Sequence, residues 1–267
     1  MSRGKFLLRP TRRPEIEAIE AESRHVFSRH THEQFGIGVI ERGAQSSLSG
    51  RGMVDAGAGD LITVNPGEVH DGMPIGDQGR CWKMLYFDPT LVIATVADIV
   101  GRGNDCEFRY PVRQDAGAAA AFARLYRIET GTTHGPQIES ESLLLSLVAD
   151  LISERRTEPK FTIPGSIRRA KDLIDDQPTE DLMLADLAIV SGLSRFQVLR
   201  GFTRATGLSP HGYLMQKRTH LARQLIRDGL SLADVAAASG FADQSHMTRT
   251  FVSKYGITPG AYATAIA

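Results

Sequence analysis

Three histidines near the N-terminus have side chains that could bind a ligand. His30 and His32 form a His-x-His pair, and His70 follows later in the chain. Imidazole nitrogens can coordinate a divalent metal ion, can hydrogen-bond a small molecule, or can satisfy the polar groups of turns. The residue types alone leave these three alternatives open.

Two arginines in the C-terminal part, Arg200 and Arg249, could read DNA bases, because a guanidinium offers two parallel donors to guanine O6 and N7. The same side chains could instead contact phosphates, which positions a protein without reading sequence. The chain has 31 basic and 31 acidic residues, but its segment 195–227 contains no acidic residue. The basic residues of that segment, which suit a phosphate backbone, are Arg195, Arg200, Arg204, Lys217, Arg218, Arg223 and Arg227.

The two arginines occupy equivalent positions of an internal repeat. LADLAIVSGLS at Leu184–Ser194 matches LADVAAASGFA at Leu232–Ala242. In each copy a small alanine allows a close helix crossing, and a glycine after it suits a tight turn with positive φ. Each copy therefore predicts a helix-turn-helix unit.

The remaining C-terminal elements are predicted from capping signals. The second helix of the first copy is predicted over Ser194–Ala205, with Ser194 as its N-cap, and that of the second copy over Asp243–Tyr255, with Asp243 as its cap. A further helix over Pro210–Arg227 would hold the two units apart.

These residues resemble the DNA-binding region of the AraC/XylS family of bacterial transcription regulators. The similarity covers about residues 167–263 and is carried by GLSRFQVLRGFTRATGLSPHGYL and GFADQSHMTRTFVSKYGITPGAY. It implies a regulator that works with RNA polymerase and whose two recognition helices enter successive major grooves of a double-stranded operator. The sequence leaves open whether it is an activator or a repressor. A cytoplasmic location is expected because no stretch has the pattern of a secretion signal or a membrane span. The groove-facing residues that the resemblance implies are Arg195, Phe196, Leu199, Arg200, Gln244, Ser245, His246 and Arg249.

The first hundred residues predict short strands separated by glycine turns, over Gln34–Glu41, Gln45–Leu48, Asp60–Asn65 and Cys81–Phe87. This region resembles the cupin-like effector-binding domain of the same family. The resemblance implies a β-barrel pocket for an unidentified small-molecule effector, although the two aromatic residues could instead fill the core. The residues expected at the pocket are His30, His32, Glu33, His70, Trp82 and Tyr86.

A metal centre of the kind found in cupin enzymes would add a glutamate about four or five residues after the histidine pair. Gly36, Ile37 and Gly38 occupy that stretch, and Glu33 and Glu41 are poorly placed substitutes. We therefore expect a pocket without a metal ion, no cofactor and no catalytic residues.

Helical spacing begins after Asp88 and predicts helices over Pro89–Val100, Gln114–Glu129 and Gln137–Arg156. The last of these carries an apolar stripe, which could pack on its own domain or form a homodimer interface. The stripe consists of Leu143, Leu144, Leu147, Val148, Leu151 and Ile152.

The predicted fold class is α+β with two domains: a cupin-like β-barrel with following helices, and an all-α domain with two helix-turn-helix motifs. We place the effector-binding domain, which is also the candidate for dimerisation, at residues 1–158, a linker at 159–165 and the AraC-type DNA-binding domain at 166–267. No stretch approaches the roughly 18 apolar residues of a membrane span, so no membrane partner is expected.

The sequence thus predicts a DNA-binding regulator modulated by a small molecule, and not an enzyme. One alternative is a metal-dependent cupin enzyme fused to a DNA-binding module, which the missing glutamate disfavours. An alkyl-transfer protein is disfavoured because Cys81 and Cys106 lack cysteine neighbours. A third alternative is a constitutive DNA-binding protein whose barrel serves only for dimerisation.

Overall fold

The computed structural model describes residues 4–76, 78–101, 106–154 and 163–266. The chain divides into two compact units, Met1–Arg156 and Thr157–Ala267, which we call the N-terminal and C-terminal units and describe separately. Most of the predicted linker, residues 159–162, lies outside the described residues. No helix among the described residues is long and apolar enough to cross a membrane.

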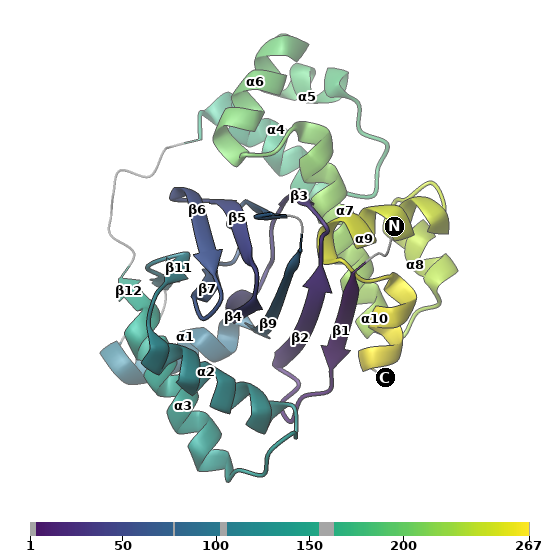
Figure 1. The fold of residues 1–267 in the computed structure, drawn as a ribbon. Coiled ribbons are helices and arrows are strands. Elements are labelled where there is room, and N and C mark those ends of the chain that lie inside the picture. The colour runs from purple at the N-terminus through teal and green to yellow at the C-terminus, as the bar shows by residue number, and fades with distance from the viewer. Residues whose placement is uncertain (1–3, 77, 102–105, 155–162, 267) are drawn as a thin grey trace. The chain divides into compact units, whose positions relative to one another are not determined.

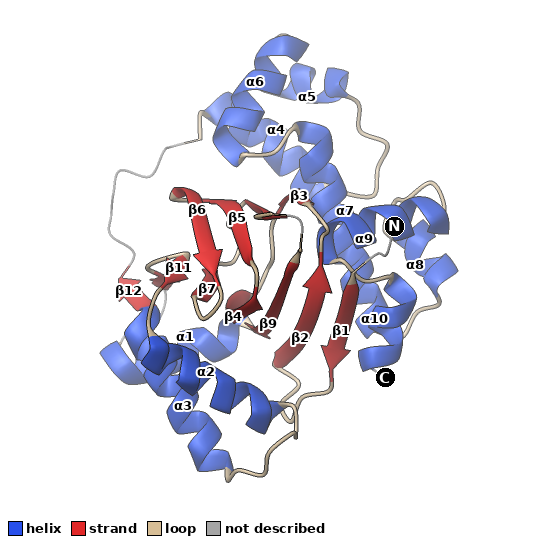
Figure 2. Cartoon of the chain, viewed as in Figure 1, coloured by secondary structure: helices blue, strands red, loops and turns tan. Residues whose placement is uncertain are grey.

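The N-terminal unit is built on two antiparallel sheets (Figures 1 and 2). The six-stranded sheet has the order β1-β2-β9-β4-β7-β11, the four-stranded sheet has the order β3-β8-β5-β6, and β10 pairs with β12. The strands are β1 (Lys5–Arg9), β2 (Ile16–Ser23), β3 (Phe27–His30), β4 (Phe35–Arg42), β5 (Ala44–Ser49), β6 (Gly52–Gly57), β7 (Leu61–Val64), β8 (His70–Pro74), β9 (Arg80–Phe87), β10 (Cys106–Phe108), β11 (Val112–Arg113) and β12 (Ile152–Glu154).

Three helices, α1 (Pro89–Val100), α2 (Ala116–Glu129) and α3 (Gln137–Leu151), cover one face of the six-stranded sheet (Figure 2). Because side chains alternate along a strand, Leu85 and Phe87 of β9 join the core that the helices complete. Met84, from the opposite face of the same strand, packs with Ala56 of the other sheet. The six-stranded sheet is therefore buried on both faces.

The fold corrects two predictions in this unit. Within the described residues the strands form two larger sheets and the two-stranded β10-β12 sheet, and no closed barrel. The third helix ends at Leu151, and the chain continues as β12, which pairs with β10. The apolar stripe of α3 packs on its own domain: Leu144 and Leu147 are buried in the helix-facing core.

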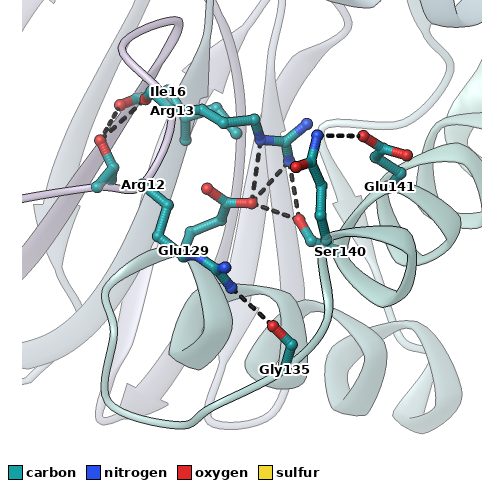
Figure 3. Close-up of polar contacts among 9 residues, drawn as sticks. Arg12, Arg13, Ile16, Glu129, Gly135, Ser140 and Glu141 are labelled. Carbon is teal, nitrogen blue, oxygen red and sulfur yellow. Dashed lines mark hydrogen bonds and ion pairs between the residues drawn. The ribbon is translucent and has the colours of Figure 1, made fainter.

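A partly buried ion pair connects the segment before β2 with α2 and α3. Arg13 Nη2 donates to Glu129 Oε1 at 2.7 Å and to Ser140 Oγ at 3.0 Å, and the Ser140 hydroxyl also donates to Glu129 (Figure 3). Glu129 is 1% exposed. The preceding residue of the segment, Arg12, is exposed and donates to the Gly135 carbonyl at 2.8 Å.

The C-terminal unit is all helical. Its helices are α4 (Gly165–Asp176), α5 (Leu184–Ser191), α6 (Arg195–Thr206), α7 (Pro210–Arg227), α8 (Leu232–Ala238), α9 (Gln244–Tyr255) and α10 (Pro259–Ile266). The predicted connecting helix, α7, contacts α4 and α6 on one side of the repeat and α8, α9 and α10 on the other. Buried Phe202 and Phe251 occupy matching places in the two copies.

Candidate nucleic-acid interface and ligand pocket

The second helices of the two repeat copies, α6 and α9, are built alike. Ser194 caps α6 and Asp243 caps α9, and each side chain accepts from the backbone N–H of the third helical residue, at 3.3 and 2.6 Å. Gly192 and Gly240 supply the turns before them, with φ of 67° and 76°, a conformation that glycine adopts without strain. The N-termini of α6 and α9 are therefore fixed by the same kind of turn and the same kind of cap.

The predicted groove-facing residues lie on the solvent side of these helices. Val198 and Phe202 of α6, and Met247 and Phe251 of α9, are buried, which leaves the opposite side of each helix exposed. His246 is half-buried. The seven exposed members of the predicted set are Arg195, Phe196, Leu199, Arg200, Gln244, Ser245 and Arg249.

Arg200 and Arg249 are the sixth residues of their helices, so the repeat presents one guanidinium at the same place in each copy. The Arg200 guanidinium lies 5.6 Å from the centre of the Phe196 ring, a cation–π contact that orients the side chain. Among the described residues, no acidic side chain pairs with either arginine. Both donor forks are available to an external acceptor.

The structure divides the basic segment predicted from sequence into external and internal residues. Lys217 Nζ lies 2.9 Å from Asp175 Oδ1, within the unit. Arg218 is buried and donates to the carbonyls of Pro178 and Glu180. These two cations stabilise the helix arrangement, so our interpretation of the whole segment as a phosphate-facing surface is corrected for them.

Lys254 is a buried cation that sequence reasoning missed. It is 6% exposed, and its Nζ donates to Gln216 Oε1 of α7 at 2.8 Å. Burial lowers its pKa to about 8, because an ammonium loses hydration in the protein interior. The signal was present in the sequence, since Lys254 falls three residues after Phe251 on the inner side of α9.

In the N-terminal unit, the structure brings the three predicted histidines together. One coordinating nitrogen from each of His30, His32 and His70 lies within 4.8 Å of those of the other two. The ring centres of His30 and His70 are 4.4 Å apart, and the rings of His32 and His70 stack at 5.0 Å. Cross-strand pairing of β3 with β8 places His30 opposite His70.

Backbone carbonyls orient two of these rings. His30 Nδ1 lies 2.7 Å from the Ser28 oxygen, and His70 Nδ1 lies 3.0 Å from the Glu68 oxygen. Since a carbonyl only accepts, Nδ1 carries the proton and Nε2 carries the lone pair in the neutral rings. Burial lowers the pKa of His70, which favours that neutral form.

The predicted aromatic residues border the same cluster. The rings of Tyr86 and His32 are 4.8 Å apart. Trp82 contacts Phe27, whose ring is 5.9 Å from that of His30. The Glu33 side chain is exposed, whereas His32 before it is buried.

Arg80 is a buried cation of the N-terminal unit that sequence reasoning missed. It is 2% exposed, stacks on Trp82 at 4.7 Å, and donates to Gln45 Oε1 and to the carbonyls of His25 and Gly72. Burial lowers its pKa to about 10, and no described carboxylate pairs with it. Its place could have been inferred, because Arg80 shares a strand face with the two predicted aromatic residues.

The position of the missing glutamate is filled by an aromatic ring. A Cβ built on Gly36 would lie 3.0 Å from Tyr86 Cε1, and one on Gly38 would lie 2.0 Å from Met84 Sδ. Any side chain at these positions would displace its neighbours. The structure thus explains why β4 carries glycines beside the histidine cluster.

Two family models match the chain. The AraC-like ligand binding domain matches residues 13–148, and a helix-turn-helix domain matches residues 187–265. The first contains the histidine cluster and Arg80, and the second contains α6 and α9. The first model alone covers half of the chain.

Known transcription regulators are similar to large parts of the chain. YbfI from Bacillus subtilis, an uncharacterized HTH-type transcriptional regulator, is 27% identical over 228 residues, with 83% of this chain and 81% of YbfI covered. The transcriptional activator NphR from Rhodococcus sp is 30% identical over 161 residues, with 57% of this chain and 48% of NphR covered. The chain thus spans about half the length of NphR.

A solved structure reproduces the whole fold. ToxT from Vibrio cholerae, determined with an unsaturated fatty acid bound, superposes with a TM-score of 0.56 at 14% identity, covering 99% of this chain and 98% of ToxT. The predicted two-domain α+β fold class is confirmed by this likeness. At this identity the likeness concerns the fold alone.

Proposed function

The chain belongs to the AraC family of transcription regulators, and on that premise we propose that α6 and α9 read operator DNA while the histidine cluster binds the small-molecule effector. The family combines a ligand-binding domain with a helix-turn-helix domain. The relatives are named as transcription regulators, so the alternative of a cupin enzyme has no support. The two activities therefore belong to separate sets of residues, one in each unit.

One observation carries the DNA-binding part of the proposal: Arg200 and Arg249 stand at the same place in two equally capped helices, both exposed. A helix of this kind fits a major groove, and an arginine on its exposed side can donate to guanine O6 and N7. The exposed Phe196 and Leu199 add apolar surface that can meet thymine methyl groups.

A mobility-shift experiment tests this part. The full chain should bind duplex DNA from the region upstream of its own gene, with affinity that falls as salt rises, because cationic side chains displace counterions from phosphates. The double variant Arg200→Ala/Arg249→Ala should lose preference for that DNA over an unrelated duplex. A wild-type chain that binds both duplexes equally at every salt concentration would contradict the proposal.

For the effector, we propose an acidic small molecule. Arg80 is a buried cation with no described carboxylate partner, and a buried charge is costly unless an opposite charge compensates it. The Phe27 ring contacts both the Arg80 guanidinium, at 5.8 Å, and the His30 ring, at 5.9 Å. An anionic group bound in this pocket would balance the guanidinium charge.

A thermal-shift panel tests the effector class. Small carboxylic acids should raise the unfolding midpoint of the full chain by mass action, and their neutral amides should raise it less. The same acids should change operator affinity, since an effector acts through different affinities for two states. Equal stabilisation by acids and amides would contradict an anionic effector, while DNA binding without any effector response would make the protein constitutive.

Finer partners are inferred from family membership. We infer that the regulator works in the cytoplasm as an activator with RNA polymerase, and that it forms a homodimer. Apolar Ile138 and Leu145 on α3 are 71% and 42% exposed, which supports self-association of the N-terminal unit. Light scattering on the purified chain should give twice the chain mass.

A further inference from the structure

We propose that His30, His32 and His70 hold a divalent first-row transition-metal ion of the class of Zn²⁺, Ni²⁺ and Co²⁺. The sequence favoured a pocket without metal, and the side-chain geometry leads us to the opposite conclusion. Three nitrogens from separate positions of β3, the following loop and β8 lie within 4.8 Å of one another. Imidazole is a preferred ligand for these ions.

The three histidine nitrogens would coordinate an ion after moving slightly closer to one another. A tetrahedral zinc site has Zn–N bonds of about 2.0–2.1 Å, which puts its nitrogens about 3.3 Å apart. The three rings already contact one another, with centres 4.4 to 5.0 Å apart. Bringing the nitrogens from within 4.8 Å to that separation requires a rotation of the side chains toward one another.

Two of the histidines have the hydrogen-bond acceptors that metal-binding histidines require for their other ring nitrogen. Ligating histidines nearly always donate their other ring nitrogen to a carbonyl or carboxylate, which fixes the tautomer and the ring orientation. His30 Nδ1 and His70 Nδ1 both lie at hydrogen-bonding distance from backbone carbonyls. The lone pair of each ring is therefore on Nε2, the nitrogen that would coordinate the ion.

Among the described residues, no carboxylate is grouped with the three histidines as a further ligand, which distinguishes the site from a closed structural centre. Glu68 accepts hydrogen bonds from the backbone of Gly50 and from Asn65, and Tyr86 fills the space over Gly36. Three protein ligands with an open position are the arrangement in which zinc binds water or a small molecule. Resting on the proposed function, this open position would receive the acidic group of the effector beside Arg80.

Cobalt titration tests the metal site directly. The full chain, treated with chelator and dialysed, should bind one Co²⁺ per chain with the visible absorption of a low-symmetry Co²⁺ site, and Zn²⁺ should displace it. His70→Gln and His32→Gln should each weaken binding at least tenfold. The matched control is His134→Gln, an exposed histidine of the same unit, which should bind as the wild type does.

The wild-type titration decides the question even if a variant fails to fold. Less than a tenth of an equivalent of Co²⁺ or Zn²⁺ bound to folded wild-type protein would overturn the proposal, as would unchanged binding in folded His70→Gln and His32→Gln. Mobility shifts on the metal-free chain separate the two proposals. Operator binding that persists without metal leaves the DNA-binding function intact, whether or not the metal site exists.

Discussion

At the scale of single residues, chemistry and exposure together distinguish arginines that the sequence cannot tell apart. Arg200 is exposed on α6, whereas Arg218 is buried and donates to two backbone carbonyls. Both belong to one basic segment free of acidic residues. The difference depends on which side of each helix faces the neighbouring helices. The repeat predicts that side for α6 and α9, whereas the composition of the basic segment does not.

Replacing Arg249 by alanine should cost about 1–3 kcal/mol on the preferred DNA sequence and relax the preference at one base pair, because a bidentate base contact is lost. Competition binding with duplexes that differ at single positions measures this. Arg168→Ala, an exposed arginine of α4 outside the recognition helices, is the control and should keep the full preference. A uniform loss on all duplexes would assign Arg249 to the phosphate backbone.

Lys254 predicts a pH dependence of stability. Its pKa in the folded protein is lowered to about 8, whereas the unfolded chain keeps about 10.4. Between these values the unfolded state binds more protons, so stability from this group rises with pH. Below pH 8 the full cost of burying the ammonium is present.

Lys254→Met should therefore be more stable than the wild type at pH 7, by about 1–3 kcal/mol after the loss of one hydrogen bond. The difference should shrink as pH rises toward 10. Thermal unfolding followed by circular dichroism at pH 7 and pH 9.5 gives both values. A variant that is less stable than the wild type by the same amount at both pH values would show that burying the Lys254 ammonium does not destabilise the folded protein.

At the scale of elements, local signals predicted helices well and strands poorly. Asp88 followed by a proline marked the start of α1, and a serine cap with a proline marked α7, so these helices have the predicted bounds. Strands β1 and β8 were missed. β8 gains its structure from pairing with the distant strand β3, and β1 from pairing with its neighbour β2. The helix expected to reach Arg156 was likewise shortened by pairing of β12 with β10.

In the candidate pocket, too, some residues were predicted from the sequence and others were missed. The His-x-His pair and His70 were predicted as ligand residues from type and spacing, and the structure places them together. Arg80 was missed because its importance depends on burial against Trp82 and Gln45. Burial of a cation on a strand is a property of the packed sheets, which one sequence does not reveal.

The ion pair that fastens the N-terminal segment predicts a stability loss. Arg13→Ala would leave the Glu129 carboxylate buried without its cation, and breaking such a pair typically costs about 3–5 kcal/mol. We expect a loss at the lower end of that range, because Arg13 is partly exposed. Arg12→Ala, which removes only an exposed contact to the Gly135 carbonyl, is the matched control and should change stability by less than about 0.5 kcal/mol. Urea unfolding measures both, and equal effects would contradict the assignment.

At the scale of the whole molecule, two units carry two kinds of chemistry. The N-terminal unit gathers imidazoles and a buried guanidinium inside paired sheets, which suits a small anion or a metal ion. The C-terminal unit presents its arginines outward on two repeated helices. The repeat was visible in the sequence because duplicated turns and caps keep their residue types.

Selection of preferred sequences from a pool of random duplexes tests the central claim most directly. The full chain should enrich one motif with two contacted segments whose centres lie about 10–10.5 base pairs apart, one helical turn, since α6 and α9 would enter successive major grooves. Arg249→Ala should lose the preference in one segment and keep it in the other. An enriched motif with a single segment, or no enrichment above the starting pool, would contradict reading of DNA by both helices.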